Sequence, residues 1–415
     1  MPRRPQLADA CVLTRSLAFA LLVGATIGYT SVVGADTRLA PVPEREWTAA
    51  QRSIVARFGV DGRPTNALRT YLHHPVLADN ILPFERYIAQ ESTLSSRHRE
   101  LLILRTAWLC RSEYVWALHA DRARGAGIGS DELTRIARGP DAPGWPPFEA
   151  VLLRAVDELL VDAFVSDSTW MALSLRFDTR ELMDAVFTVA EFTMVAGTVN
   201  SLKVDVDDWL NERLPSAISA RPAATRTDVR LIGKSPRIAP LDPADWSPEV
   251  KAWLARYGNR PVANIYRTYA RHLAMDRPRT SVSEHIRQDS TLSQRIRELL
   301  IVRIGVRCRS EYEWAAHAPA LRRAGMTDAE IEAVVDGPAA VRDPVERALL
   351  RAVDELHNDA VVSDGTWREL SARFDARQML DILTTVGGYR MVSMALNTFG
   401  VQLEPDAERF PAGLR

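Results

Sequence analysis

Two pairs of residues combine a carboxylate with an imidazole at the same separation. Glu100 precedes His119 by 19 residues, and Glu298 precedes His317 by the same 19. A histidine with a pKa near neutrality can give or take a proton at pH 7, and a buried glutamate can orient it. Glu313 lies four residues before His317, a spacing that places both on one helix face. We therefore expect acid–base chemistry, with these five residues as the candidate catalytic groups.

The two pairs are not equivalent. Val115 stands in the first where Glu313 stands in the second, so we expect the second to be active if only one is. A simpler interpretation is that both histidines are core residues and both glutamates are surface charges paired with an arginine three residues earlier.

Arginines flank each glutamate at helical spacing. An enol or enolate intermediate would need positive charge nearby, so these arginines are candidate anion-binding residues. Two tryptophans near the histidines are core aromatics that could also wall a pocket. The candidate substrate-binding residues are Arg97, Arg105, Arg295, Arg303, Trp116 and Trp314.

The chain has three cysteines, which excludes a disulfide-rich scaffold and a structural four-thiolate zinc site. Cys110 and Cys308 occupy equivalent positions; as small hydrophobes they would be buried, and a disulfide between them is an alternative. A metal site at Glu298, Glu313 and His317 lacks a clear third nitrogen or sulfur ligand. We therefore expect no metal and no cofactor.

One segment of the chain occurs twice. Residues 92–103 reappear at 290–301 and residues 110–119 at 308–317, both displaced by 198 positions. A register kept over this length indicates a tandem duplication. A proline-rich stretch between the copies is typical of a linker. The predicted division is a first domain at 41–214, a linker at 215–240 and a second domain at 241–415.

Helix signals dominate both copies. Ser310 with Glu313 and Thr327 with Glu330 have capping-box spacing. Glycine–proline pairs are expected to end helices. Residues 178–199 and 375–396 are predicted to form long amphipathic helices. We expect an all-α fold of six or seven helices per copy, without a sheet.

The segment from Glu100 to His119, and its repeat, resembles the carboxymuconolactone decarboxylase and alkylhydroperoxidase D superfamily. This resemblance implies a tandem duplication of an alkylhydroperoxidase D-like helical bundle. Such bundles usually assemble as dimers built into trimers or hexamers. A duplicated chain would look like one fused dimer, and we expect a homo-oligomer that is a trimer of two-domain chains.

In the peroxidase branch of that superfamily, a Cys-x-x-Cys pair opens the helix that carries the histidine. The two thiols would fall on Ser112 and Val115 in the first copy, and on Ser310 and Glu313 in the second. Neither copy has the pair. The decarboxylase branch works without cysteines, which fits this residue set better.

The N-terminus has the pattern of an export signal. Arg3, Arg4 and Arg15 precede an uncharged run at residues 16–35, which ends in small residues. Residues 1–35 are therefore predicted to be a signal peptide, and the mature protein to be periplasmic or secreted. The alternative is a retained membrane anchor formed by residues 16–35.

The composition of the chain limits the classes of molecule that it is expected to bind. The 415 residues carry 52 Lys plus Arg against 53 Asp plus Glu, which argues against nucleic-acid binding. We expect a small-molecule substrate, and no membrane contact unless the N-terminal segment is retained.

Three functions remain open. The first is non-redox acid–base chemistry on a small organic acid or lactone, such as decarboxylation. The second is a hydroperoxide reductase with peroxiredoxin activity that uses Cys110 or Cys308 with an external thiol. The third is a non-catalytic small-molecule-binding or assembly protein.

Overall fold

The computed structural model describes residues 37–60, 62–215, 235–258 and 261–411. The predicted signal peptide at 1–35 lies outside these residues, as does most of the predicted linker at 215–240.

The first half of the chain is built from α-helices. They are α1 (Ala49–Phe58), α2 (Asn66–Tyr71), α3 (Pro75–Gln90), α4 (Ser96–Leu109), α5 (Glu113–Gly125), α6 (Ser130–Arg138), α7 (Pro147–Asp162), α8 (Asp167–Ser174) and α9 (Thr179–Leu202).

The second half repeats this series. Its helices are α10 (Pro248–Leu254), α11 (Asn264–Tyr269), α12 (Leu273–Glu284), α13 (Gln294–Arg307), α14 (Glu311–Arg323), α15 (Asp328–Asp336), α16 (Pro344–Asp359), α17 (Asp364–Ser371) and α18 (Ala376–Phe399).

The all-α prediction is confirmed, since the described residues contain no strand and only one isolated bridge, between Val60 and Arg63. The number of helices was predicted too low. Each half has nine α-helices within the described residues, because short helices such as α2 and α11 lie between the longer ones.

The two capping-box predictions have different outcomes. Thr327 and Glu330 form the expected reciprocal cap at the start of α15. Ser310 occupies the N-cap position of α14, but its side chain makes no capping hydrogen bond. The Glu313 side chain lies toward His317 instead, so this second prediction is wrong.

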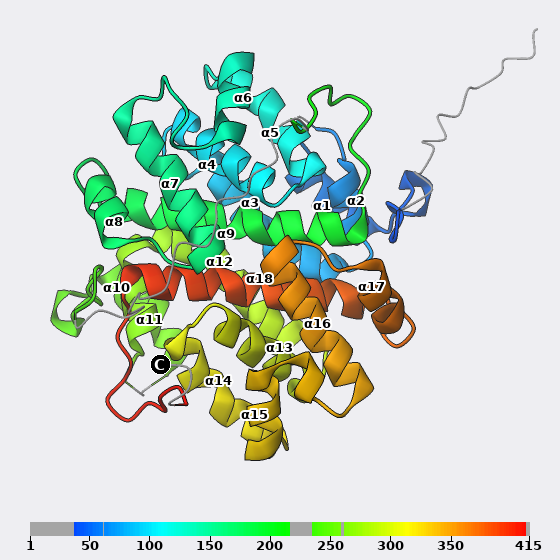
Figure 1. The fold of residues 1–415 in the computed structure, drawn as a ribbon, viewed down its shortest axis with the longest axis vertical. Coiled ribbons are helices and arrows are strands. Elements are labelled where there is room, and N and C mark those ends of the chain that lie inside the picture. The colour runs from blue at the N-terminus through cyan, green and yellow to red at the C-terminus, as the bar shows by residue number, and fades with distance from the viewer. Residues whose placement is uncertain (1–36, 61, 216–234, 259–260, 412–415) are drawn as a thin grey trace, which may run out of the picture.

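The two long helices α9 and α18 pack on each other across the middle of the molecule (Figure 1). Both were predicted to be amphipathic, yet nearly every residue of each is buried. The reason is that each helix packs against its own half on one side and the other half on the opposite side. By length and composition α9 could span a membrane, but its apolar window is wholly buried inside the protein.

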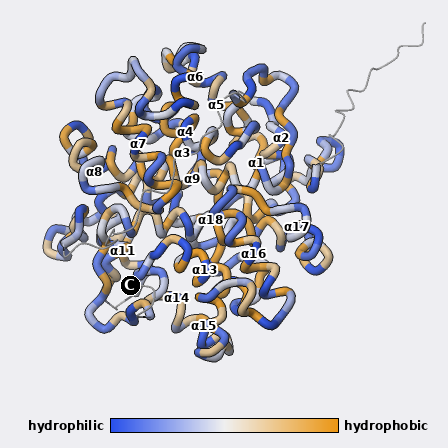
Figure 2. Tube along the Cα trace, viewed as in Figure 1, coloured by the Kyte–Doolittle hydropathy of each residue, from blue (hydrophilic) through white to orange (hydrophobic). Residues whose placement is uncertain are grey.

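Close backbone approach lets these central helices pack. A Cβ atom added to Gly387 would lie 2.3 Å from Met194 Cγ, so the contact between α18 and α9 depends on this glycine. Hydrophobic residues gather toward the centre and hydrophilic residues toward the outer loops (Figure 2). The result is one continuous core shared by both halves.

Equivalent hydrogen bonds join the halves in both directions. Asn200 donates to the carbonyl of Ala360, and Asn397 donates to the carbonyl of Ala163. Helices α3 and α12 also pack together. The duplicated chain therefore folds as two mutually packed copies of one unit. In each copy a helix pair, α4 with α5 or α13 with α14, positions the candidate glutamate and histidine.

Candidate functional site

The second half places the imidazole of His317 between two carboxylates. Nδ1 of His317, on α14, lies 2.7 Å from Oε2 of Glu298 on α13. Nε2 of the same ring lies 3.5 Å from Oε2 of Glu313, one helical turn earlier on α14. With Nδ1 donating to Glu298, Nε2 is the nitrogen that faces Glu313. The three residues predicted from the sequence thus converge.

These groups lie at a cavity of about 380 Å³. Glu298, Glu313 and His317 all line it, and the ring of Tyr389 meets the imidazole edge-on at 4.9 Å between centroids. A volume of this size lies at the small end of the range for ligand pockets in proteins. The arrangement can hold a small molecule beside the acid–base groups.

Burial controls the proton affinity of Glu313. The side chain is 3% exposed, and burial raises its pKa to about 7. This pKa is the net result of burial, which raises it most, of His317 and Arg279, which lower it, and of the Glu298 carboxylate, which raises it. No hydrogen-bond donor among the described residues reaches Oε2 of Glu313. The carboxyl group is therefore able to carry a transferable proton near neutral pH.

The first half keeps the glutamate–histidine contact and has a cavity of about 350 Å³ that Glu100 lines, but His119 does not line that cavity. Nδ1 of His119 lies 2.8 Å from Oε2 of Glu100, and burial lowers the pKa of this histidine. The hollow beside His119 has a volume of only about 40 Å³. Leu118 and Phe192 line it, at positions where the second half has Ala316 and Tyr389. These larger apolar side chains separate His119 from the cavity beside Glu100.

The structure does not bring the four predicted anion-binding arginines to the site. Arg97 pairs with Glu132 and Glu149, and Arg105 pairs with Asp157. Their counterparts make the matching pairs, Arg295 with Glu330 and Glu346 and Arg303 with Asp354. These arginines point from α4 and α13 toward other helices of the bundle. None of the four lines the cavity, so the prediction does not hold for them.

Other arginines line the cavity instead: Arg279, Arg287, Arg297 and Arg323. Arg279 comes from α12, far from the glutamate–histidine motif in sequence. The available signal was a difference between the copies, since Ile81 occupies the position of Arg279 in the first half.

The two tryptophans are core residues. Trp116 and Trp314 are both buried, and neither lines the cavity. Trp314 packs instead against Phe410 near the C-terminus, with 5.7 Å between ring centroids.

Both candidate thiols are buried, and they form no disulfide with each other. Burial raises the pKa of Cys308 to about 11. Its Sγ lies 4.0 Å from Nδ1 of His357. A thiol with so high a pKa is a poor nucleophile at neutral pH, because the thiolate is the reactive form.

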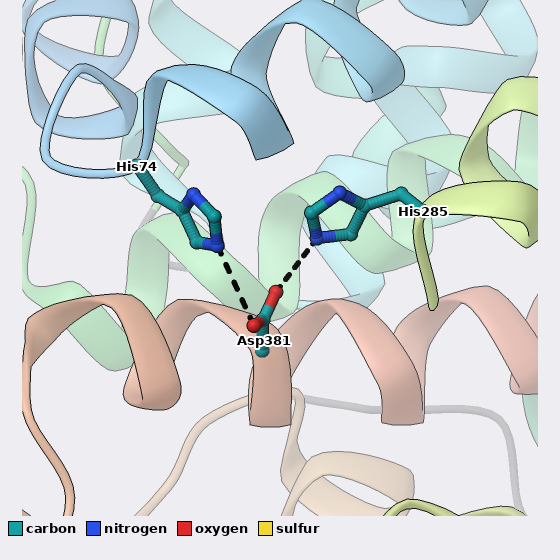
Figure 3. A group of neighbouring side chains, drawn as sticks. All are labelled: His74, His285 and Asp381. Atoms are coloured by element: carbon teal, nitrogen blue, oxygen red, sulfur yellow. Dashed lines mark hydrogen bonds and ion pairs between the residues drawn. The ribbon is translucent and has the colours of Figure 1, made fainter. Parts of the chain in front are cut away.

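A different group has the residue types of a metal site. His74 from the start of α3, His285 after α12 and Asp381 from α18 converge where the two halves meet (Figure 3). Nε2 of His285 lies 2.8 Å from Oδ1 of Asp381, and Nε2 of His74 lies 3.4 Å from Oδ2. Glu298, Glu313 and His317 do not form such a group.

The hydrogen bonds of His74 do not suit metal ligation. Nδ1 of His74 accepts from the backbone N–H of Leu77, which places the ring proton on Nε2, the nitrogen that faces Asp381. A ligating Nε2 would instead need a free lone pair and a proton on Nδ1. We therefore interpret the group as a hydrogen-bonded carboxylate.

The matching place in the other copy supports this interpretation. There Tyr87 donates to Asp184 at 3.0 Å, and His272 lies 3.2 Å from the same carboxylate. Tyr87 corresponds to His285 in the duplication. A phenol fills the same role as an imidazole, as expected for a hydrogen-bonding position.

Comparisons with known proteins agree with the duplication. The model of the carboxymuconolactone decarboxylase family matches residues 75–158 and again 274–355. These regions fall inside the predicted domains at 41–214 and 241–415. No curated protein matches the chain.

Among solved structures, the chain is similar to an uncharacterized peroxidase-related protein from Silicibacter sp. TM1040. The identity is 18% and the TM-score 0.37, over 42% of this chain and 96% of that one. The chain therefore contains two carboxymuconolactone decarboxylase family domains in tandem, at the two regions that the family model matches.

Proposed function

We propose that the second domain is the catalytic unit and performs acid–base chemistry on a small organic acid or lactone. The observation that carries this proposal is the position of His317. Its imidazole lies between the carboxylates of Glu298 and Glu313 at the wall of a cavity of about 380 Å³. Two proton-transferring groups thus meet beside space for a small ligand.

Decarboxylation is the reaction that best uses these groups. The bond between the substrate carbon and its carboxylate breaks, carbon dioxide leaves, and the electron pair remains on the substrate as an enolate. The protonated carboxyl of Glu313 then gives its proton to carbon. The Glu313 carboxylate then recovers a proton from water by way of Nε2 of His317, which takes the proton and passes it on, while Glu298 orients the ring through Nδ1. Arginines at the cavity stabilise the developing negative charge.

In this proposal the first domain serves assembly rather than catalysis. Its histidine is sealed beneath Leu118 and Phe192, and Val115 replaces the second carboxylate. Its helices α3 and α9 complete the packing around α12 and α18 of the second domain.

The hydroperoxide reductase alternative has less support. Cys110 and Cys308 are buried, and the raised pKa of Cys308 disfavours its thiolate. Treatment with peroxide followed by a dimedone-type probe tests it, because a sulfenic acid on either cysteine would form an adduct.

The location and assembly of the chain remain part of the proposal. We expect cleavage after residue 35 and a periplasmic or secreted trimer of two-domain chains, with an anchor at residues 16–35 as the alternative. N-terminal sequencing of fractionated cells distinguishes cleavage from anchoring. Light scattering of the purified protein gives its mass and hence its oligomeric state.

The catalytic proposal is tested by incubating the protein with a panel of small carboxylic acids and lactones in D2O. Nuclear magnetic resonance reports both carbon dioxide loss and deuterium incorporation at carbon. We expect at least one panel member to react, and Glu313→Gln to abolish the reaction. Carboxylate binding without reaction by any member would instead favour the non-catalytic binding role.

A further inference from the structure

Arg279 is a buried cation at the wall of the second-domain cavity. The residue is 2% exposed relative to solvent, yet it lines the same cavity as Glu313 and His317. Burying a charged group costs free energy unless neighbouring groups pair with it. The contacts of Arg279 therefore indicate why this charge is kept inside the protein.

Four neighbours fix the guanidinium group. Nε and Nη2 donate to Oδ1 of Asp276 at 3.1 and 2.7 Å, and Nη2 also donates to Thr280 at 3.1 Å. Nη1 donates to Ser283 at 3.2 Å, and the group lies 4.6 Å from the ring centre of Tyr269. Nη1 carries two N–H groups, so one remains for a ligand in the cavity.

Asp276 is itself held in place. Its Oδ2 accepts a hydrogen bond of 2.8 Å from Nε1 of Trp253, on α10. Asp276 thus joins Arg279 to a second helix, and the direction of the guanidinium is set before any ligand arrives. Such preorganisation lowers the cost of ordering a binding site.

The first domain lacks this arrangement. Ala78 and Ile81 occupy the positions of Asp276 and Arg279, and both are buried apolar residues. Replacing a buried ion pair with apolar residues is often neutral or stabilising, so the pair contributes little to stability on average. The pair is present only in the domain whose histidine lines the cavity, which indicates a role in binding.

The charge of the cavity favours an anion. Its lining includes four arginines and two glutamates. One of those glutamates, Glu313, is the carboxyl that burial tends to keep protonated. The balance of fixed charge facing a ligand is therefore positive.

We propose that Arg279 binds the carboxylate of the substrate and that Asp276 is its positioning residue. The ligand is a small molecule with a carboxylate that Nη1 binds while the reacting carbon lies beside Glu313 and His317. This inference rests on the proposed function for the identity of the reacting groups. The binding step itself needs no turnover, so it is testable separately.

The test is calorimetric titration of the full protein with acetate, succinate and benzoate, and with benzamide as the uncharged analogue of benzoate. The variant is Asp276→Ala with Arg279→Ile, which copies the apolar pair of the first domain. Arg368→Ile, on the exposed surface of α17, removes the same charge away from the cavity and is the matched control. Circular dichroism and Tm establish that each variant is folded.

We expect the parent and Arg368→Ile to bind at least one carboxylate, and the double variant to bind it at least about tenfold more weakly. Arg279→Lys keeps the positive charge but loses the planar guanidinium group with its several N–H donors. We therefore expect an affinity between those of the parent and the double variant. The proposal would be overturned if the parent and the double variant bound with equal affinity, or if benzoate and benzamide bound equally well. It would also be overturned if no carboxylate bound at concentrations up to about 20 mM.

Titrating His317→Gln separates the two proposals, because this change leaves Arg279 and Asp276 in place. Carboxylate binding that persists in His317→Gln supports the role of Arg279 whether or not the parent turns over any substrate. Binding by the parent without turnover contradicts the proposed function alone.

Discussion

Oε2 of Glu313 lies 3.5 Å from Nε2 of His317, whereas Val115 occupies the matching place before His119. This contact is the chemical difference between two domains that otherwise share a fold and a glutamate–histidine pair. The surrounding residues differ as well: Leu118 and Phe192 stand where the second domain has Ala316 and Tyr389, and Glu85 stands where it has Ser283. The duplicated sites thus differ in that His317 lines a cavity of about 380 Å³, whereas His119 lines a hollow of only about 40 Å³.

The pH dependence of turnover follows from the protonation of Glu313. Because burial raises its pKa to about 7, the carboxyl holds its proton at pH 6 and loses it above neutrality. A proton donor with this pKa predicts turnover that falls about tenfold per pH unit well above pH 7. Rates measured from pH 5 to 9 check this. Turnover that rises through neutrality would show that Glu313 acts as a base instead.

The same pKa predicts a pH-dependent effect on stability. A carboxyl whose folded-state pKa lies above its unfolded value stabilises the fold below pH 4.5, and this contribution is lost as pH rises through about 7. Glu313→Gln cannot lose a proton, so its stability relative to the parent should increase from pH 5 to pH 8. The change is at most about 3 kcal/mol, since one pKa unit corresponds to about 1.4 kcal/mol.

Urea unfolding of the parent and Glu313→Gln at pH 5 and pH 8 measures this difference. Val115→Ala in the first domain is the control, because it removes no titratable group. A difference between parent and Glu313→Gln that is the same at both pH values would show that the pKa is not raised.

The carboxylate of Asp381 is predicted to stabilise the contact between the domains. Burial would raise its pKa, but hydrogen bonds from His285, His74 and Thr291 lower it overall. Asp381→Asn weakens this set of contacts and should cost about 3 kcal/mol. His285→Tyr, which copies Tyr87, should cost less than about 1 kcal/mol. Unfolding midpoints check both, and an equal loss in the two variants would refute the equivalence of the two positions.

Chelation is predicted to leave the protein unchanged. Because Nδ1 of His74 accepts from Leu77 and Nε2 of His285 donates to Asp381, the ring nitrogens that face the carboxylate carry protons and do not offer a lone pair to a metal. Treatment with EDTA should not lower Tm, and added Zn²⁺ or Co²⁺ should not raise it. A rise in Tm that disappears in His285→Tyr would instead identify a metal site.

Much of this architecture was predictable from the sequence because it depends on local spacing. Glu298 and His317 meet because each lies at a fixed place on one of two adjacent helices, and Glu313 follows from the helical repeat. The arginines were not predictable in this way. Arg295 and Arg303 are close to Glu298 in sequence, but the turn of α13 directs them to Glu346 and Asp354.

Long-range packing accounts for what the sequence did not reveal. Arg279 reaches the cavity from α12, and no spacing rule links it to the motif on α13 and α14. The burial of α9 and α18 on all sides depends on the other half of the chain. The small size of the hollow beside His119 likewise depends on Phe192, which lies far from His119 in sequence but 4.7 Å from it between ring centroids.

The central claim is that His317 and not His119 takes part in catalysis. The most direct measurement is kcat/KM of His317→Gln and His119→Gln, each shown to be folded, on a substrate that the parent turns over. We expect a loss of at least about 100-fold for His317→Gln and a change within about twofold for His119→Gln. Equal losses in both variants, or an unchanged rate in His317→Gln, would contradict it.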